Sequence, residues 1–187
     1  MARTTNNVLT KNYSGKVAGQ YSLRTRGKKS IIAGLPKPRE GAPSTVQVDL
    51  QKAFKLAVLY ARKAMNNPDL KEAYAAVRRD NQSAYNVAFA DAYKGPELSD
   101  LRTESYTGAK GDQILVQAID NFRVTNVKFI LLSADGNVLE TGDAIEDENG
   151  YDWVFTCKVE NPSLPGTIIR ITAEDIPKNK AVLEARL

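Results

Sequence analysis

Histidine is absent from this chain of 187 residues, and cysteine occurs once, as Cys157. Without histidine the chain lacks the commonest general base, the commonest transition-metal ligand and the Ser-His or Cys-His pairs that activate nucleophiles. A single cysteine excludes an intrachain disulfide and a zinc site built on cysteines. These shortages predict a protein that is not an enzyme, so we assign no catalytic residue, no metal ligand and no cofactor.

Long apolar runs are also missing. No segment approaches the roughly 18 to 20 apolar residues that span a bilayer, and the first residues, MARTTNNVLTKNY, have no apolar core of the kind a signal peptide needs. We therefore expect synthesis in the cytoplasm without a signal peptide, and no membrane partner. The final location stays open, with a virion or another released assembly among the alternatives.

Charge is distributed unevenly along the chain. Residues 1–45 carry a net charge of +8, residues 46–97 carry +2 and residues 98–187 carry −6, which gives +4 for the whole chain. A chain with a basic end and an acidic end can bind an anionic partner or the acidic end of another copy.

The basic N-terminal region, residues 1–43, combines charge with strand periodicity. Segments 16–24 and 29–33 alternate and flank Arg26-Gly27-Lys28, a turn typical of a hairpin, and closely spaced prolines follow as an extended linker. An isolated hairpin is marginal in water, so we predict that this arm pairs with a neighbouring subunit. The predicted subunit-contact residues are Lys16, Val17, Tyr21, Leu23, Arg24, Arg26, Lys28, Lys29, Ile31 and Ile32.

Residues 44–96 carry the signals of a small helical domain. Ser44 and Gln47 have capping-box spacing, and Asn67-Pro68-Asp69 marks the start of a second helix. A third helix is predicted over residues 82–94, before the stop signal Gly95-Pro96. Its predicted core side consists of Tyr85, Phe89, Ala92 and Tyr93, and Tyr74 is the corresponding core tyrosine of the second helix.

Residues 97–112 are predicted to be a linker, and strand patterns fill residues 113–187. Period-2 segments separated by Asp135-Gly136, Asn149-Gly150 and Pro165-Gly166 predict an antiparallel β-sandwich. Alternating residues of one strand are expected to face its core: Trp153, Phe155, Cys157 and Val159.

The segment GDQILVQAIDNFRVTNVKFILLSADGNVLETGDAIEDENGYDWVFT resembles bacterial immunoglobulin-like β-sandwich modules, in which an Asp-Asn turn, a long strand ending in Asp-Gly and a later Trp strand recur. Modules of this kind usually adhere, decorate or act as spacers. The segments SGKVAGQYSLRTRGKKSIIAGLPKPREGAPS and SAYNVAFADAYKGPEL are similar to small uncharacterised proteins of bacteria and their phages, from which no functional residue carries over. The predicted fold class is α+β, with a basic hairpin arm, a three-helix segment and an immunoglobulin-like antiparallel β-sandwich.

An acidic stretch offers oxygen ligands of the type that Ca²⁺ prefers. It comprises Asp143, Glu146, Asp147, Glu148, Asn149 and Asp152, but its spacing matches no EF-hand loop. We interpret it as a solvated loop.

Three functions follow in order of preference. The first is a non-enzymatic structural subunit, such as a phage-particle component or a filament or sheath subunit, whose arm pairs onto a neighbour. The second is a nucleic-acid-associated protein that contacts phosphates through Arg24, Arg26, Lys28 and Lys29. The third is a surface- or carbohydrate-binding sandwich. Symmetry, stoichiometry, partner identity and cellular or viral origin are outside the reach of the sequence.

Overall fold

The computed structural model describes residues 2–5, 14–26, 29–37 and 41–187. These residues form three helices and three four-stranded antiparallel sheets, which confirms the α+β class. The chain divides into two compact units. One comprises Met1–Leu50 with Arg79–Gln82, and the other comprises Gln51–Arg78 with Ser83–Leu187.

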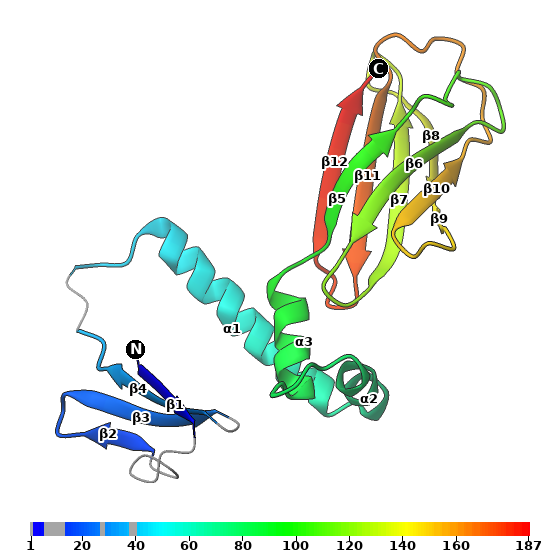
Figure 1. Ribbon diagram of the computed structural model, residues 1–187. Coiled ribbons are helices and arrows are strands. Elements are labelled where there is room, and N and C mark those ends of the chain that lie inside the picture. Colours follow the sequence, from blue (N-terminus) through cyan, green and yellow to red (C-terminus); the bar gives the residue numbers. More distant parts are fainter. Residues whose placement is uncertain (1, 6–13, 27–28, 38–40) are drawn as a thin grey trace. The chain divides into compact units, whose positions relative to one another are not determined.

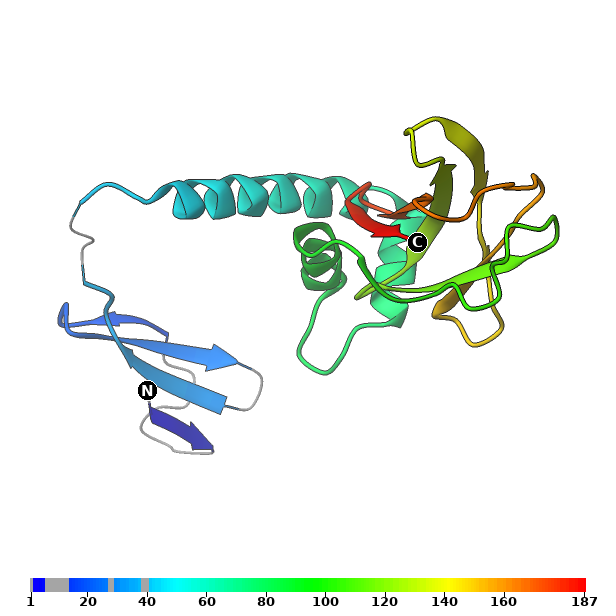
Figure 2. The same cartoon turned by 90° about the horizontal axis from the view of Figure 1, so that it is seen from above.

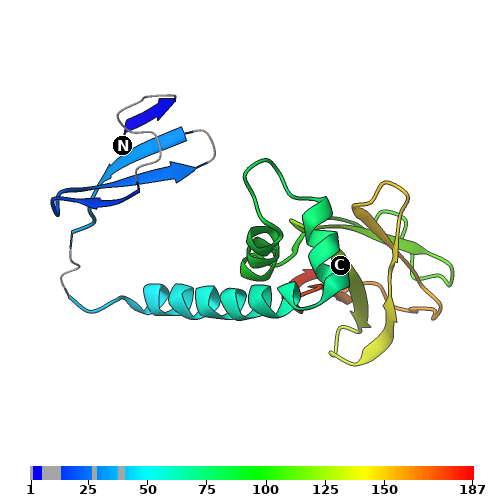
Figure 3. The same ribbon diagram turned by 90° about the horizontal axis from the view of Figure 1, so that it is seen from below.

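The N-terminal sheet has the strand order β1-β4-β3-β2 (Figure 3). Its strands are β1 (Ala2–Thr5), β2 (Gly15–Val17), β3 (Tyr21–Arg26) and β4 (Lys29–Gly34). The expected hairpin is present as β3 and β4, with Arg26 opposite Lys29. The predicted segment 16–24 is divided by a turn at residues 18–20 into β2 and the first part of β3, and β1 was not predicted. β1 and β2 pair with the two edges of that hairpin and satisfy backbone groups that a two-stranded ribbon leaves open.

The first two helices begin where their capping signals predict, and the third begins two residues after its predicted start at residue 82. They are α1 (Thr45–Met65), a single uninterrupted helix (Figure 2), α2 (Pro68–Ala76) and α3 (Ala84–Tyr93). The Ser44 backbone N–H donates to Gln47 Oε1 at 3.0 Å, and Asn67 Oδ1 accepts from the N–H groups of Asp69 and Leu70. Ser83 caps α3 in the same way, by accepting from the Asn86 N–H. None of these helices is long and apolar enough to cross a membrane.

The helices share a small core. Its fully packed members are Ala61, Ala64, Tyr74 and Ala88, so the prediction for Tyr74 is confirmed. The predicted core side of α3 is confirmed for Tyr85 and Phe89, which pack against this core, but it is wrong for Tyr93, which is 41% exposed. The completely buried residues of this helix, Ala88 and Asp91, were not predicted. A helix that is apolar nearly all round has no unique core side, and close approach to its neighbours selects its smaller residues.

The C-terminal residues form two further sheets with strand orders β5-β6-β10-β9 and β12-β11-β7-β8 (Figure 1). The strands are β5 (Glu97–Arg102), β6 (Gln113–Ile119), β7 (Val124–Leu132), β8 (Val138–Asp143), β9 (Ile145–Glu146), β10 (Asp152–Thr156), β11 (Ile168–Asp175) and β12 (Lys180–Arg186). Inward side chains of both sheets form one core, in which the rings of Phe129 and Phe155 stack at 4.9 Å between centroids.

The Trp strand follows its prediction over most of its length. Trp153, Phe155 and Cys157 are buried members of the core, but Val159 is 47% exposed. The reason is that β10 ends at Thr156, so the alternation no longer fixes which side a residue faces. Burial raises the pKa of the Cys157 thiol to about 11, which keeps it protonated and inert as a nucleophile at neutral pH.

The stretch 97–112 contains a strand where the sequence predicted only a connection. β5 pairs with β6, but its register shifts between Ser99 and Arg102. Asp100 lies in this irregularity with a φ of 47°. Such a bulge interrupts the period-2 alternation by which a strand is recognised in a sequence.

The loop after β5 contains two glycines with similar backbone angles, so alanine variants at these positions can test how tightly the loop packs. Gly108 has φ +92° and Gly111 has φ +98°, but only a Cβ at Gly108 would lie 2.5 Å from a backbone oxygen, that of Asn161. Gly111→Ala should lower the free energy of unfolding by about 1 kcal/mol through backbone strain alone. Gly108→Ala should cost roughly 1 to 3 kcal/mol more through the clash, as measured by urea unfolding. Equal losses in the two variants would contradict this packing.

Candidate functional site

The predicted subunit-contact residues lie on three strands of the N-terminal sheet. Lys16 and Val17 belong to β2, Tyr21, Leu23, Arg24 and Arg26 to β3, and Lys29, Ile31 and Ile32 to β4. Lys28 lies outside the described residues.

The strand register separates most of these side chains into two faces. Val17 is opposite Tyr21, and Leu23 is opposite Ile32, so these four apolar side chains share one face. Successive residues of a strand point to opposite faces, so Lys16, Arg24 and Lys29 lie on the other face, where Arg24 is opposite Ile31. The sheet therefore has an apolar face, Val17, Tyr21, Leu23 and Ile32, and a basic face, Lys16, Arg24 and Lys29.

The acidic stretch 143–152 does not converge on one point. Asp152 is buried and accepts a hydrogen bond of 2.5 Å from Arg102 Nη2, which holds the pKa of this carboxyl below its ordinary value. Asn149 Nδ2 donates to the other oxygen of Asp152 at 2.9 Å. Asp143, Glu146, Asp147 and Glu148 are exposed, but the stretch is not one loop, because Asp143 ends β8 and Glu146 belongs to β9.

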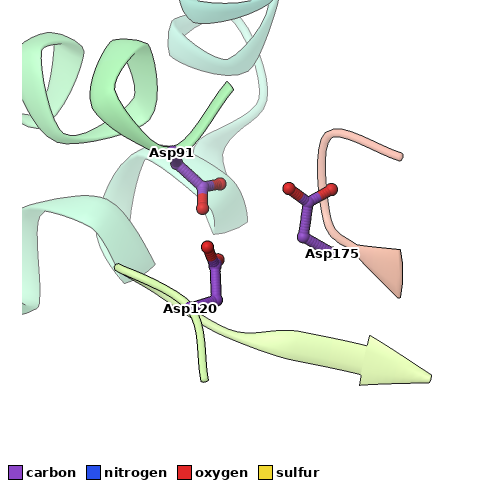
Figure 4. A group of neighbouring side chains, drawn as sticks. All are labelled: Asp91, Asp120 and Asp175. Carbon is purple, nitrogen blue, oxygen red and sulfur yellow. The ribbon is translucent and has the colours of Figure 1, made fainter. Parts of the chain in front are cut away.

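A different group of carboxylates does come together. Asp91 in α3, Asp120 after β6 and Asp175 at the end of β11 each present an oxygen within 4.8 Å of the other two. Figure 4 shows the three side chains pointing toward one another. Asp91 and Asp175 are completely buried, and Asp120 is half-buried. We call this group the aspartate cluster.

A chain of hydroxyl groups holds Asp91 from the helical side. Tyr74 donates its hydroxyl to Asp91 Oδ2 at 2.5 Å, and the hydroxyls of Tyr60 and Tyr74 lie 2.8 Å apart. The ring of Phe122, from the turn after β6, packs on the Tyr74 ring with 4.5 Å between centroids. Asp91 is thereby fixed by α1, α2 and one turn of the β region.

The other two carboxylates are held by donors close to them in the chain. Asp120 Oδ2 accepts from the backbone N–H groups of Phe122 and Arg123. Both oxygens of Asp175 accept from Asn179, at 2.6 Å from its backbone and 2.7 Å from its side chain. Asp91 Oδ1 and Asp120 Oδ1 are buried without a hydrogen-bond donor.

The end of α3 is joined to the two turns by side-chain amides. Asn121 donates to the Ala90 carbonyl at 2.8 Å, and Asn179 lies 3.3 Å from the Asp91 carbonyl. The Asp91 carbonyl is in the last turn, where a helix leaves carbonyls without backbone partners, and the Ala90 carbonyl also accepts from the Lys94 N–H at 3.1 Å. A Cβ on Gly95 would lie 2.8 Å from Asn179 Cβ, so a residue without a side chain is needed for this approach.

Burial controls the electrostatics of the aspartate cluster. It raises the pKa of Asp91 from 3.8 to about 7, opposed by the Tyr74 hydrogen bond and assisted by Asp120 and Asp175. Burial also raises the pKa of Asp175 and of Tyr74. Three carboxylates in this arrangement can share protons or coordinate a cation.

Sequence analysis did not identify this cluster. The three aspartates are far apart in the chain, and each has an ordinary local role in a helix, a turn or a strand end. The one available hint is Asp91, an acidic residue between apolar neighbours in AYNVAFADAY. Comparison with models of protein families, with curated proteins and with solved structures finds no match.

The raised pKa of Asp91 predicts a pH dependence of stability. Between its ordinary value of 3.8 and about 7, the folded protein holds a proton that the unfolded chain has released. The free energy of unfolding should therefore fall as pH rises through this window, by up to about 1.4 kcal/mol per pH unit, and level off above it. Urea unfolding between pH 4 and 8 in the presence of a chelator measures this slope.

Two variants test whether the Asp91 carboxyl causes the slope of stability against pH. Asp91→Asn cannot ionise and should flatten it, whereas Asp143→Asn, which alters an exposed carboxyl, should leave it unchanged. The same slope in the wild type and in Asp91→Asn would contradict the assignment to Asp91.

Proposed function

We propose that this protein is a non-enzymatic structural subunit that assembles with copies of itself or decorates a larger assembly. The observation that carries the proposal is the apolar face of the N-terminal sheet. Its four side chains, Val17, Tyr21, Leu23 and Ile32, are exposed or half-buried, and Ala33 is the only buried residue among the described residues of 14–37. A sheet reaches stability by burying one face against another layer.

We propose an acidic edge of a second copy as the surface that covers this sheet. Residues 138–146 form β8 and β9, the outer strands of the two C-terminal sheets. Val138 and Ile145 are 63% and 77% exposed there, next to the exposed carboxylates of Asp143 and Glu146. Strand addition at β2, whose Val17 and Lys16 point to opposite faces, would place this edge beside both faces of the sheet, so that its apolar and acidic side chains meet the apolar and the basic residues.

The first helix provides a second apolar surface for association. Val46, Leu50 and Phe54 recur every four residues on one side of α1 and are 51–65% exposed. They continue the line of Ala57, Ala61 and Ala64, which is buried. Helix faces of this kind usually mark a site of protein contact.

The order of the C-terminal strands supports an immunoglobulin-like sandwich as part of this proposal. In chain order, β5, β6, β7, β9, β10, β11 and β12 take the places of strands A to G, which gives sheets ABED and CFG with β8 added beside C. The disulfide of antibody domains is excluded by the single cysteine. A sandwich of this kind suits a spacing or decorating role in a phage particle, filament or sheath, an argument that rests on fold analogy.

A charge exchange between two variants tests the assembly. Variant A carries Lys16→Glu and Arg24→Glu in the arm, and variant B carries Asp143→Lys and Glu146→Lys at the edge. Each variant alone should stay monomeric under conditions in which the wild type assembles, because like charges then meet at the contact. An equimolar mixture should assemble, since every contact in it can join opposite charges. Sedimentation velocity and light scattering measure the outcome.

Two controls show whether the effect depends on charge at the arm and the edge rather than on the net charge of the chain. Lys71→Glu with Arg186→Glu changes the charge by the same amount at exposed positions outside the arm and outside the edge 138–146, and should assemble as the wild type does. Raising the salt concentration should weaken wild-type assembly. A monomeric wild type at all concentrations, or variants A and B that assemble alone, would overturn the proposal.

The basic face of the sheet supports nucleic acid as a second candidate partner. Lys16, Arg24 and Lys29 lie on one face, where they can approach phosphates together. The exposed Tyr21 lies on the opposite face, which gives no support for base stacking beside these cations. We therefore keep this function second to assembly.

Salt dependence tests the second candidate. If the face binds phosphates, the affinity for a single-stranded oligonucleotide should fall linearly with salt on a double-logarithmic plot, and Arg24→Ala or Lys29→Ala should each reduce the slope by about 1. Lys128→Ala is the control. Affinity that does not change with salt, or equal slopes in all variants, would exclude this function.

A further inference from the structure

We propose that Asp91, Asp120 and Asp175 bind one Ca²⁺ ion, which links the end of α3 to the turns that follow β6 and β11. The site is independent of the proposed assembly surfaces, because none of its residues belongs to the N-terminal sheet or to the edge 138–146.

The first argument is a buried oxygen without a partner. Asp91 is completely buried, and its Oδ1 has no hydrogen-bond donor, while its Oδ2 is occupied by Tyr74. The side chain points into the space between Asp120 and Asp175 (Figure 4). Asp120 Oδ1 is also buried without a donor. Buried polar atoms in this state are rare and call for a ligand, an ion or a proton.

The second argument is that no cationic side chain in the described part of the chain pairs directly with this group, although Lys94 acts on Asp120 at longer range. Within the described ranges, no Lys or Arg forms an ion pair with any of the three aspartates. The last turn of α3 holds no basic residue, and its carbonyl ends add partial negative charge at the same place. A cation would balance both contributions.

The third argument is size. The three ligand oxygens lie within 4.8 Å of one another. Ca²⁺ binds oxygen at about 2.3–2.6 Å, so two ligands on opposite sides of it lie up to about 5 Å apart. Mg²⁺ binds at about 2.0–2.1 Å, so its opposite ligands lie about 4.2 Å apart, a separation that the 4.8 Å limit also includes. The size of the group therefore accommodates Ca²⁺, and the comparison of Ca²⁺ with Mg²⁺ in the unfolding experiment decides between the two ions.

The residues around the cluster orient two of its carboxylates, and a pocket lies beside Asp120. The oxygens of Asp120 and Asp175 that accept hydrogen bonds are held by the backbone of residues 122–123 and by Asn179, so the carboxylates are oriented before an ion arrives. Asp120 also lines a pocket of about 410 Å³, together with the exposed Ile119 and Tyr151. Asp91 and Asp175 do not line this pocket, so the cluster borders it through Asp120 alone.

Thermal unfolding of the full chain tests the site. Protein stripped with a chelator should unfold at a temperature about 5–10 °C higher once CaCl₂ reaches about 100 times its Kd. Mg²⁺ should give a smaller rise at equal concentration. Asp120→Asn should abolish the rise, whereas Glu146→Gln, which removes an exposed carboxylate from the same pocket, should retain it.

Two outcomes separate an ion from a shared proton or a purely structural role. In chelator, Asp120→Asn should be at least as stable as the wild type, because the amide can donate to Asp91 Oδ1, and the order should reverse in Ca²⁺. Tb³⁺, a luminescent substitute for Ca²⁺, should emit on excitation of the nearby tyrosines in the wild type and not in Asp120→Asn. An unfolding temperature unaffected by Ca²⁺, or a loss in Asp120→Asn that is equal with and without Ca²⁺, would overturn the site.

Discussion

The contact between Tyr74 and Asp91 is the interaction on which the helical part of the larger unit depends. The four fully packed residues of the helical core include three alanines, so apolar burial there is small. The Tyr60-Tyr74-Asp91 chain connects all three helices through hydroxyl and carboxylate groups, and Phe122 covers it. A buried polar network of this kind is specific in geometry, and the penalty for leaving one member without a partner is high.

This arrangement explains why the helices and the two C-terminal sheets belong to one compact unit. Asn121 and Asn179 bind the carbonyl groups at the end of α3, and Gly95 permits the close approach. The turns after β6 and β11 therefore cap a helix and also place two carboxylates beside Asp91. The contact of these two turns with the end of α3 therefore both caps the helix and assembles the aspartate cluster.

Charged side chains are exposed in the N-terminal sheet, whereas some carboxylates are buried in the larger unit. In the N-terminal sheet, cations are exposed on one face and the apolar residues of the other face lack a core, which favours association with another surface. In the larger unit, the apolar residues form a complete core between two sheets, and carboxylates are buried at its end. We therefore propose association as the role of the first part and ion or proton binding as that of the second.

The sequence by itself determined the features that depend on neighbouring residues. Capping signals located the starts of α1 and α2, and alternation located β4, β6 and β7 closely. The segment 16–24 was predicted as one strand but forms β2, a turn and part of β3. The strands β1 and β5 were missed because they are short or bulged, and such segments become strands through their pairing partners. Only the tertiary structure decided that Asp91, Asp120 and Asp175 meet, since no local pattern encodes contact between a helix and two separate turns. It also decided which side of α3 is buried, because packing selects small residues when a helix is apolar all round.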